Sequence, residues 1–267
     1  MTAPVVLITG ANTGIGFEIV RALSSSTKPY HILVGARSCE KASNAIIAVQ
    51  KEYPTSTSTY SFVVIDIEQD ELIQSAFEQI LSAHGKLDVL INNAGAQLET
   101  KFTSGEITTK REPWDRSTSI PLLLKSSDLR ILFITSGTST LAGSESQAIP
   151  INHIPSAGWP KATDSLRVRA YRSSKAGPNM LMREWHRILK EDGVKVFGIS
   201  PGYLATGLGG DASFNKKMGA GHSAVAGPSV QSVVEGQRDE DAGKVLTRFG
   251  IQESLFARKA PCGPSTQ

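Results

Sequence analysis

A tyrosine and a lysine stand four positions apart in the segment AYRSSKAG, residues 170–177. Residues at this spacing lie on the same face of a helix, so the phenol of Tyr171 and the ammonium of Lys175 would be neighbours. A free tyrosine has a pKa of about 10 and gives up its proton reluctantly at neutral pH. A nearby ammonium favours the phenolate, and lowering the pKa by about three units needs ~4 kcal/mol of differential stabilisation. The pair predicts a general acid and base in a desolvated cleft, whereas on an open surface it would be an ordinary solvated pair.

A glycine-rich segment, TGANTGIG at residues 9–16, has the composition of a loop that binds phosphate groups. Gly10 permits a tight turn, Gly14 lets the backbone approach a pyrophosphate, and Gly16 lets the following helix pack close to a sheet. The free N–H groups at the start of that helix would face the anion. We therefore expect a dinucleotide site, which includes these three glycines together with Asn12, Thr13 and Ile15.

The elements that must position these residues follow from short apolar runs, which are typical of parallel strands covered on both faces. Strand patterns occupy residues 4–8, 31–36, 62–66, 88–92, 130–135 and 195–200, and helix patterns occupy 15–25, 39–52, 69–83 and 173–191. This alternation predicts an α/β fold with a Rossmann-type doubly wound parallel sheet. A length of 267 residues fits one domain that spans residues 1–267.

Two segments lack a regular pattern: residues 137–170 are rich in Ser, Ala and Pro, and residues 207–230 are rich in Gly and Ala. Both follow strand ends on the side where open α/β sheets bind ligands. We expect a substrate lid at 137–170 and a substrate-side segment over 207–267. Trp159 is a candidate wall residue of the substrate site, although a loop aromatic is as often a packing anchor.

Composition excludes several other classes of function. The net charge is +3 and the 28 basic residues are scattered, so nucleic acid is not an expected partner. The five histidines are dispersed, which argues against a metal site. No segment reaches the ~20 consecutive apolar residues of a membrane span, and two distant cysteines suit a reducing compartment. The sequence predicts a cytoplasmic protein that binds a small molecule.

Four motifs occur in a fixed order: TGANTGIG, then NNAG at 92–95, then Y-x-x-x-K, then SPG at 200–202. In combination they make residues 4–210 resemble the short-chain dehydrogenase/reductase family, and the long gap before Tyr171 resembles its carbonyl-reductase-like members. The resemblance implies an NADPH-dependent oxidoreductase that reduces a ketone or aldehyde to an alcohol, or catalyses the reverse. Tyr171 would be the general acid and base, and Lys175 would orient the cofactor ribose. Ser136, after the fifth strand, would bind the substrate carbonyl, in preference to Ser139 and Ser144.

The same resemblance assigns further cofactor contacts. Asp66 would contact the adenine amino group, and Asn93 the cofactor ribose, although the first could equally be a helix N-cap and the second a turn residue. The remaining contacts it implies are Ala94, Gly95, Pro201, Gly202, Leu204 and Thr206.

The end of the second strand indicates which dinucleotide is bound. The chain there reads Gly35, Ala36 and Arg37, with no carboxylate to accept from the ribose hydroxyls of NAD. A guanidinium that faces a 2′-phosphate makes a charge-assisted bond worth ~1.5–3 kcal/mol. Arg37 therefore favours NADP(H), the alternative being a solvated loop residue.

One family feature is missing. Family members carry a catalytic asparagine in the helix between strands four and five, but this sequence has no asparagine between Asn93 and Asn152, and that helix is shortened. Either Ser117, Ser119 or bulk water replaces the asparagine in the proton relay, or the chain binds NADP with weak or no turnover. A third alternative is a non-reductive use of the cofactor. Because the family commonly pairs through this helix, we expect a monomer.

Overall fold

The computed structural model describes residues 2–95, 125–159, 169–208 and 212–252. These residues form an eight-stranded sheet in the order β3-β2-β1-β4-β5-β6-β7-β8, parallel except for the last strand. The strands are β1 (Val5–Ile8), β2 (His31–Ala36), β3 (Thr59–Val64), β4 (Val89–Asn92), β5 (Arg130–Ile134), β6 (Lys195–Ser200), β7 (Val245–Thr247) and β8 (Gly250–Ile251). The Rossmann-type doubly wound fold in one domain is thus confirmed.

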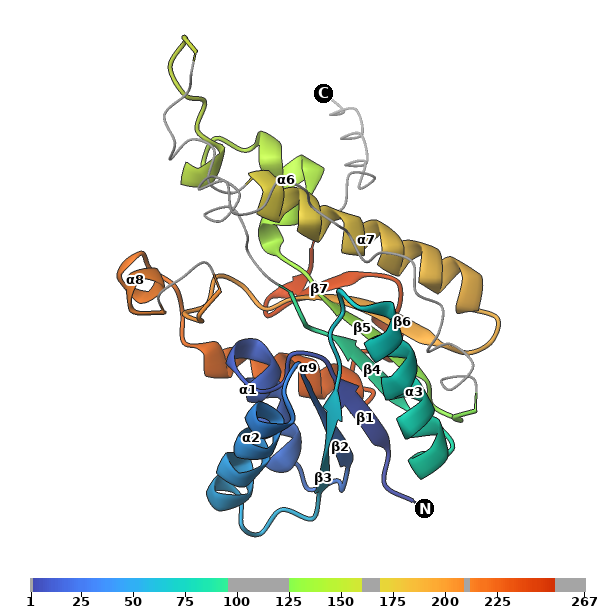
Figure 1. Ribbon diagram of the computed structural model, residues 1–267. Coiled ribbons are helices and arrows are strands. Elements are labelled where there is room, and N and C mark those ends of the chain that lie inside the picture. Colours follow the sequence, from blue (N-terminus) through green and yellow to red (C-terminus); the bar gives the residue numbers. More distant parts are fainter. Residues whose placement is uncertain (1, 96–124, 160–168, 209–211, 253–267) are drawn as a thin grey trace, which may run out of the picture.

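Long helices cover both faces of the sheet (Figure 1). Helices α1 (Gly14–Ser24), α2 (Cys39–Glu52) and α9 (Ala226–Val234) lie on one face, and α3 (Asp70–His84) and α7 (Arg169–Leu189) lie on the other. Alternate side chains of each strand enter different cores, since Val6 and Ile8 pack with the first group whereas Val5 and Leu7 pack with the second. Both faces are therefore apolar, which explains the nearly continuous apolar runs in the sequence.

Most predicted elements form, with shifted ends. Strands β2 and β6 have the predicted bounds, whereas β3 begins at Thr59, three residues earlier than predicted. Helix α7 starts at 169 instead of 173 and ends at Leu189 instead of 191. The short helices are η2 (Gly137–Ser139), α6 (Leu141–Glu145), η3 (Pro150–Asn152), α8 (Ala212–Lys217), η5 (Ser223–Val225) and η6 (Asp239–Asp241).

None of the elements after β6 was predicted, among them α9, β7 and β8. Helix α9 packs tightly on α1, because a β-carbon on Gly227 would lie only 2.5 Å from the carbonyl oxygen of Glu18. Strand β7 extends the sheet beyond β6. Residues 226–251 thus complete the sheet and its helical cover. The assignment of the segment 207–267 to the substrate side stays a prediction, and residues 209–211 and 253–267 of that segment lie outside the described residues.

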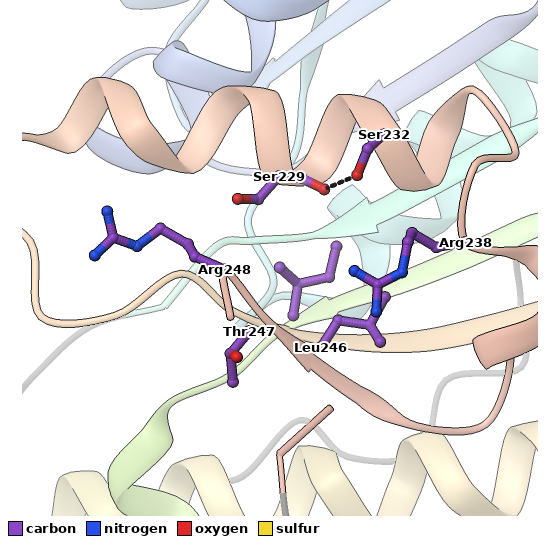
Figure 2. A pocket seen from close by; sticks show the side chains of 7 residues that line it. Ser229, Ser232, Arg238, Leu246, Thr247 and Arg248 are labelled. Atoms are coloured by element: carbon purple, nitrogen blue, oxygen red, sulfur yellow. Dashed lines mark hydrogen bonds between the residues drawn. The ribbon is translucent and has the colours of Figure 1, made fainter. Parts of the chain in front are cut away.

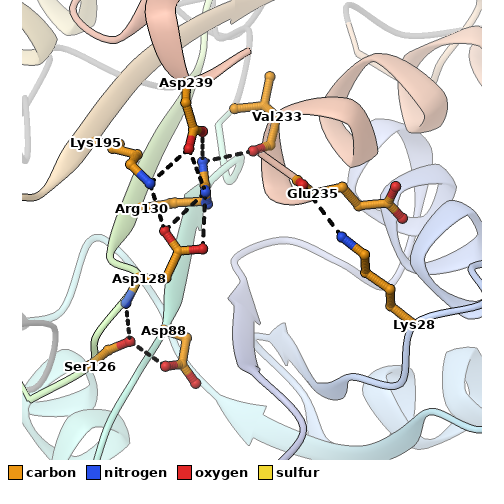
Figure 3. Close-up of polar contacts among 9 residues, drawn as sticks. All are labelled: Lys28, Asp88, Ser126, Asp128, Arg130, Lys195, Val233, Glu235 and Asp239. Carbon is orange, nitrogen blue, oxygen red and sulfur yellow. Dashed lines mark hydrogen bonds and ion pairs between the residues drawn. The ribbon is translucent and has the colours of Figure 1, made fainter. Parts of the chain in front are cut away.

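An ion-pair network closes the end of the sheet at which β5 and β6 begin (Figure 3). The Arg130 side chain, only 3% exposed, pairs with Asp128 at 2.9 Å and with Asp239, and it donates to the carbonyl oxygen of Val233 at 3.1 Å. Lys195 pairs with Asp128 at 2.8 Å and with Asp239 at 2.7 Å. The network joins the first residues of β5 and β6 to η6 and α9, far from the carboxyl ends of the strands.

In the part of the chain that the structure describes, no helix combines the length and apolarity needed to cross a bilayer. Nor do three or more His, Cys, Asp or Glu side chains gather there in a geometry that could hold a metal ion. The cytoplasmic location and the monomeric state stay predictions.

Candidate active site

The predicted site residues gather at one edge of the sheet, because each segment that carries them follows the carboxyl end of a parallel strand or lies on α7. Residues 10–16 follow β1, Arg37 follows β2, and Asp66 follows β3. Residues 93–95 follow β4, Ser136 follows β5, and residues 201–206 follow β6. Tyr171 and Lys175 come from α7, which packs against β5, β6 and η2.

The glycine loop has the backbone of an anion site. Gly10 (φ +64°) and Gly14 (φ +57°) are left-handed, a conformation that favours glycine. Thr13 is the N-cap of α1, yet its side chain makes no capping hydrogen bond, and the first turn holds no acidic residue. The first N–H groups of α1 are therefore open to an anion.

Asn93 braces this loop. Its Nδ2 donates to the carbonyl oxygens of Thr9 at 2.8 Å and Gly10 at 3.2 Å. The Thr9 hydroxyl oxygen accepts from the N–H groups of Asn93 at 3.0 Å and Ala94 at 2.9 Å. A β-carbon on Gly16 would lie 2.3 Å from the Gly10 carbonyl oxygen and 2.6 Å from Asn93 Nδ2, so only glycine allows this close packing. Thr9, the first residue of the TGANTGIG motif, was not among the predicted site residues, because its bonds to Asn93 and Ala94 depend on tertiary packing. The contact of Asn93 with the cofactor ribose stays a prediction.

A cation, Arg37, follows β2, and a carboxylate, Asp66, follows β3. Asp66 accepts from the N–H of Glu68 at 3.0 Å and from Nε2 of Gln69 at 3.3 Å. The N-cap of α3 is Gln69, so the alternative in which Asp66 caps the helix is wrong, and Asp66 instead stabilises the preceding turn. Arg37 is exposed, and no hydrogen bond or ion pair joins its guanidinium to another described residue.

Lys175 lies where β4 and β5 end. Its Nζ donates to the carbonyl oxygen of Ile134 at 2.9 Å and lies 3.7 Å from where a β-carbon on Gly95 would stand. Burial lowers the pKa of Lys175 to about 8. Tyr171, half-buried in the first turn of α7, precedes it by one turn on the same helix face. The NNAG and Y-x-x-x-K motifs are thus in contact.

Among Ser136, Ser139 and Ser144, only Ser136 has a hydroxyl that does not donate to a main-chain oxygen of the described residues. Its Oγ accepts from the N–H of Thr138 at 3.2 Å and lies 3.0 Å from Thr138 Oγ1. Ser139 is buried and donates to the Ser136 carbonyl oxygen at 2.5 Å, and Ser144 donates to the Leu141 carbonyl oxygen at 2.6 Å. Of the three hydroxyls, those of Ser139 and Ser144 are directed at main-chain oxygens.

The segment after β6 returns toward the glycine loop. Gly202, which follows Pro201, is left-handed (φ +102°), and Leu204 is buried and bridges to Gly221. Thr206 is buried, with its Cβ 3.8 Å from where a β-carbon on Gly14 would stand. The segments after β1 and β6 therefore lie next to each other at Gly14 and Thr206.

Arg172, which was not among the predicted site residues, connects the predicted lid segment to α7. Its Nε donates to the carbonyl oxygen of Thr138 at 2.9 Å, and its Nη1 donates to Oδ1 of Asn152 at 2.9 Å. The side chain next to Tyr171 thus fixes residues 138–152 of the predicted lid. Ser117 and Ser119, the proposed replacements for the missing asparagine, lie outside the described residues, as does the shortened helix.

A small cavity of about 120 Å³ lies elsewhere, between α9 and β7 (Figure 2). Its polar groups are largely engaged, since Ser232 donates to the Ser229 carbonyl oxygen, Thr247 donates to Gly250, and Arg238 pairs with Asp241. It contains none of the predicted site residues and is not the candidate active site. Its lining residues are Ile199, Ser229, Ser232, Arg238, Leu246, Thr247 and Arg248.

Comparisons with known proteins agree with this geometry. A family model described as short chain dehydrogenase matches residues 4–123. The short-chain dehydrogenase/reductase tropE of Talaromyces stipitatus is 41% identical over 92% of this chain and 95% of its own length. The short-chain dehydrogenase/reductase eupG of a Phoma species is 44% identical over 93% and 96%. An alcohol dehydrogenase from Thermococcus sibiricus, solved with 5-hydroxy-NADP, has the same fold, with a TM-score of 0.63 at 20% identity over 97% of this chain and 100% of that one.

Proposed function

Because the chain belongs to the short-chain dehydrogenase/reductase family, we propose that it uses NADPH to reduce a ketone or aldehyde, with Tyr171 as the general acid. Membership makes it an oxidoreductase that acts on carbonyl or alcohol groups with a nicotinamide dinucleotide. The observation that carries the proposal is the half-buried ammonium of Lys175, which lies beside Gly95 and one helical turn after Tyr171.

The residues present fit a dinucleotide. The uncapped start of α1 offers N–H groups to a pyrophosphate, and Asn93 holds the glycine loop in the required conformation. The predicted set of Gly10, Asn12, Thr13, Gly14, Ile15 and Gly16 forms that loop. Asp66, Asn93, Ala94, Gly95, Pro201, Gly202, Leu204 and Thr206 are the further contacts we propose.

Arg37 makes NADP(H) the proposed dinucleotide. Its guanidinium is exposed and has no partner among the described residues, so binding a 2′-phosphate would break no existing ion pair. The end of β2 also lacks the carboxylate that would accept hydrogen bonds from the ribose hydroxyls of NAD. The fold accommodates such a group, since the Thermococcus enzyme was solved with 5-hydroxy-NADP.

When bound, the cofactor supplies the hydride. Tyr171 donates its proton to the carbonyl oxygen, and the Lys175 ammonium favours the phenolate that remains. Ser136 donates a hydrogen bond to the same oxygen, since its Oγ accepts from the Thr138 N–H and its proton is not given to any main-chain oxygen in the described part of the chain. In the reverse direction Tyr171 takes the proton back.

The substrate side is rich in apolar side chains that stay exposed. Trp159 is 80% exposed, which favours its role as a wall residue over that of a packing anchor. Contact between such side chains and an apolar substrate removes apolar surface from water, which favours binding by roughly 25 cal/mol per Å² of buried surface. We therefore propose an apolar carbonyl compound as substrate. Among the described residues of the segments 137–170 and 207–230, the large apolar side chains that are exposed are Leu141, Ile149, Ile151, Ile154, Trp159, Phe214 and Met218.

Turnover tests this function. NADPH oxidation is measured with a panel of aromatic and aliphatic ketones and aldehydes, for the wild type, Tyr171→Phe and the matched control Tyr60→Phe, whose hydroxyl donates to Ser56 in the distant β3 region. Loss of the general acid should lower kcat by about 10²–10⁴-fold in Tyr171→Phe alone. Equal rates in all three proteins would refute the proposal, and NADPH binding without turnover would favour a non-catalytic NADP-binding protein.

Cofactor choice is tested separately. Arg37→Glu should raise the Kd for NADPH more than tenfold and leave the Kd for NADH unchanged or lower, because only NADPH carries the 2′-phosphate. Arg248→Glu is the matched control, since Arg248 borders the cavity under α9 and not the glycine loop. An unchanged NADPH affinity in Arg37→Glu would show that another group selects the cofactor.

A further inference from the structure

Three polar side chains beneath the Ser136 turn have no role in the function proposed above: Thr135, Ser139 and Asn179. Asn179 lies two turns after Tyr171, and the spacing 171, 175, 179 places it on the same helix face as Lys175. Its Nδ2 donates to Ser139 Oγ at 2.9 Å, and Ser139 Oγ donates to the carbonyl oxygen of Ser136 at 2.5 Å. Two hydrogen bonds therefore connect α7 to the main chain of Ser136.

A second connection runs parallel to the first. Thr135 Oγ1 donates to the carbonyl oxygen of Lys175 at 3.1 Å and lies 3.2 Å from Ser139 Oγ. Thr135 is 4% exposed and Ser139 is 6% exposed, so water does not compete strongly for these bonds. With the bond from Arg172 to the Thr138 carbonyl oxygen, the turn over residues 135–139 is thus fastened to α7 at three positions, and Asn179 is the one that acts through Ser139.

The direction of each bond assigns a distinct task to Asn179. Ser139 has one proton, which it gives to Ser136, so its oxygen must accept any bond from the helix. The Asn179 amide supplies that donor, while its Oδ1 is buried without a partner among the described residues. Only the Nδ2 end therefore satisfies Ser139, and this fixes the rotation of the Ser139 hydroxyl toward Ser136.

We propose that Asn179 is a positioning residue that holds the Ser136 hydroxyl in register with Tyr171 and Lys175, acting through Ser139. The inference rests on the proposed function, because it assumes that Ser136 binds the substrate carbonyl. Catalytic groups tolerate little displacement, and a shift of about 1 Å can lower a rate about 100-fold.

Asn179→Asp tests the inference with nearly unchanged shape. The carboxylate cannot donate, and it competes with the Ser136 carbonyl oxygen for the Ser139 proton. We expect kcat for the ketone to fall about 10- to 100-fold while the Kd for NADPH stays unchanged. Met180→Ala, which alters a neighbouring side chain that is 66% exposed, is the control and should keep the wild-type kcat.

A double-mutant cycle separates positioning from general support of the fold. In a Ser136→Ala background, Asn179→Asp should have no further effect on kcat, because the group that it positions is gone. An equal fold-loss in both backgrounds would overturn the inference, as would a wild-type kcat in Asn179→Asp.

Amide hydrogen exchange in the ligand-free protein gives a readout that does not need turnover. Exchange at Thr138 and Ser139, whose N–H groups donate to Ser136, should be faster in Asn179→Asp than in the wild type or Met180→Ala. If the wild type reduces no carbonyl compound, the proposed function fails, while faster exchange would still support the link from Asn179 to Ser136. Unchanged exchange at both amides would overturn that link.

Discussion

Replacing the half-buried Lys175 with methionine should stabilise the ligand-free protein while it removes activity. Burial lowers the pKa of Lys175 from 10.5 to about 8. At about 1.4 kcal/mol per pKa unit, the desolvated ammonium disfavours the folded state by about 3 kcal/mol relative to a neutral group. Methionine has a similar length and no charge, but it loses the hydrogen bond to Ile134, worth about 1 kcal/mol. The free energy of unfolding at pH 7 should therefore rise by about 2 kcal/mol in Lys175→Met.

The pH dependence of this difference follows from the direction of the shift. Between about pH 8 and 10.5 the unfolded lysine holds its proton while the folded one has released it, so the wild type gains stability as pH rises. The stability of Lys175→Met does not rise in this way, because methionine does not titrate. The difference in free energy of unfolding between Lys175→Met and the wild type should therefore be largest at and below pH 7 and should vanish toward pH 10.5.

Urea unfolding of the ligand-free proteins over this pH range measures the effect. Lys190→Met, which replaces an exposed lysine just after α7, is the matched control and should show no comparable change. A Lys175→Met protein less stable than the wild type at pH 7, or a difference that does not change with pH, would refute the reasoning.

Two further substitutions test the packing that supports the site. Gly16→Ala should destabilise the protein by about 1–3 kcal/mol and weaken NADPH binding, because the new methyl group would lie 2.3 Å from the Gly10 carbonyl oxygen. Asp239→Asn should destabilise it by about 2 kcal/mol at pH 7, because the buried Arg130 guanidinium loses one of two carboxylate partners. The Arg130 hydrogen bond holds the pKa of Asp239 below its usual value, so this stabilisation is lost as the pH falls through that lowered pKa.

Thermal unfolding and NADPH titration measure both effects. Gly207→Ala adds a methyl group into open space and should leave stability nearly unchanged. Asp192→Asn is the control for charge, since no ion pair or hydrogen bond joins the Asp192 side chain to another described residue. If Gly16→Ala were as stable as the wild type, α1 could move away from the glycine loop at no cost, and the packing argument would be wrong. An Asp239→Asn effect that persists below pH 3 would exclude the carboxylate as its source.

Hydrophobic pattern predicted the sheet well because both of its faces are covered. Strand β3 lies at the edge of the described sheet, and its first residues, Thr59 to Ser61, are exposed or half-exposed, so they carry little apolar signal. Helix α9 contains small residues such as Gly227, which allow close packing on α1 but have a low helix propensity, so no clear helix pattern marks that part of the sequence. Strand β7 has only three residues, too few to show a periodicity.

The candidate site was predictable where a motif specifies a backbone conformation or a helix face. The left-handed Gly10 and Gly14 and the shared face of Tyr171 and Lys175 are local properties. The bracing of the glycine loop by Asn93 and the contact between Asn179 and Ser139 depend on tertiary packing. Short polar side chains with such roles look the same in sequence as ordinary turn and surface residues.

The central claim is that Tyr171 completes a hydride transfer from NADPH to a carbonyl carbon, and isotopic labelling tests it most directly. The protein is incubated with NADPH carrying deuterium at either C4 position and with a ketone that it turns over. The alcohol from the wild type should carry deuterium on its carbinol carbon from one of the two labelled cofactors, and Tyr171→Phe should yield almost none. Unlabelled alcohol from both cofactors, or equal labelling by Tyr171→Phe at the wild-type rate, would contradict the claim.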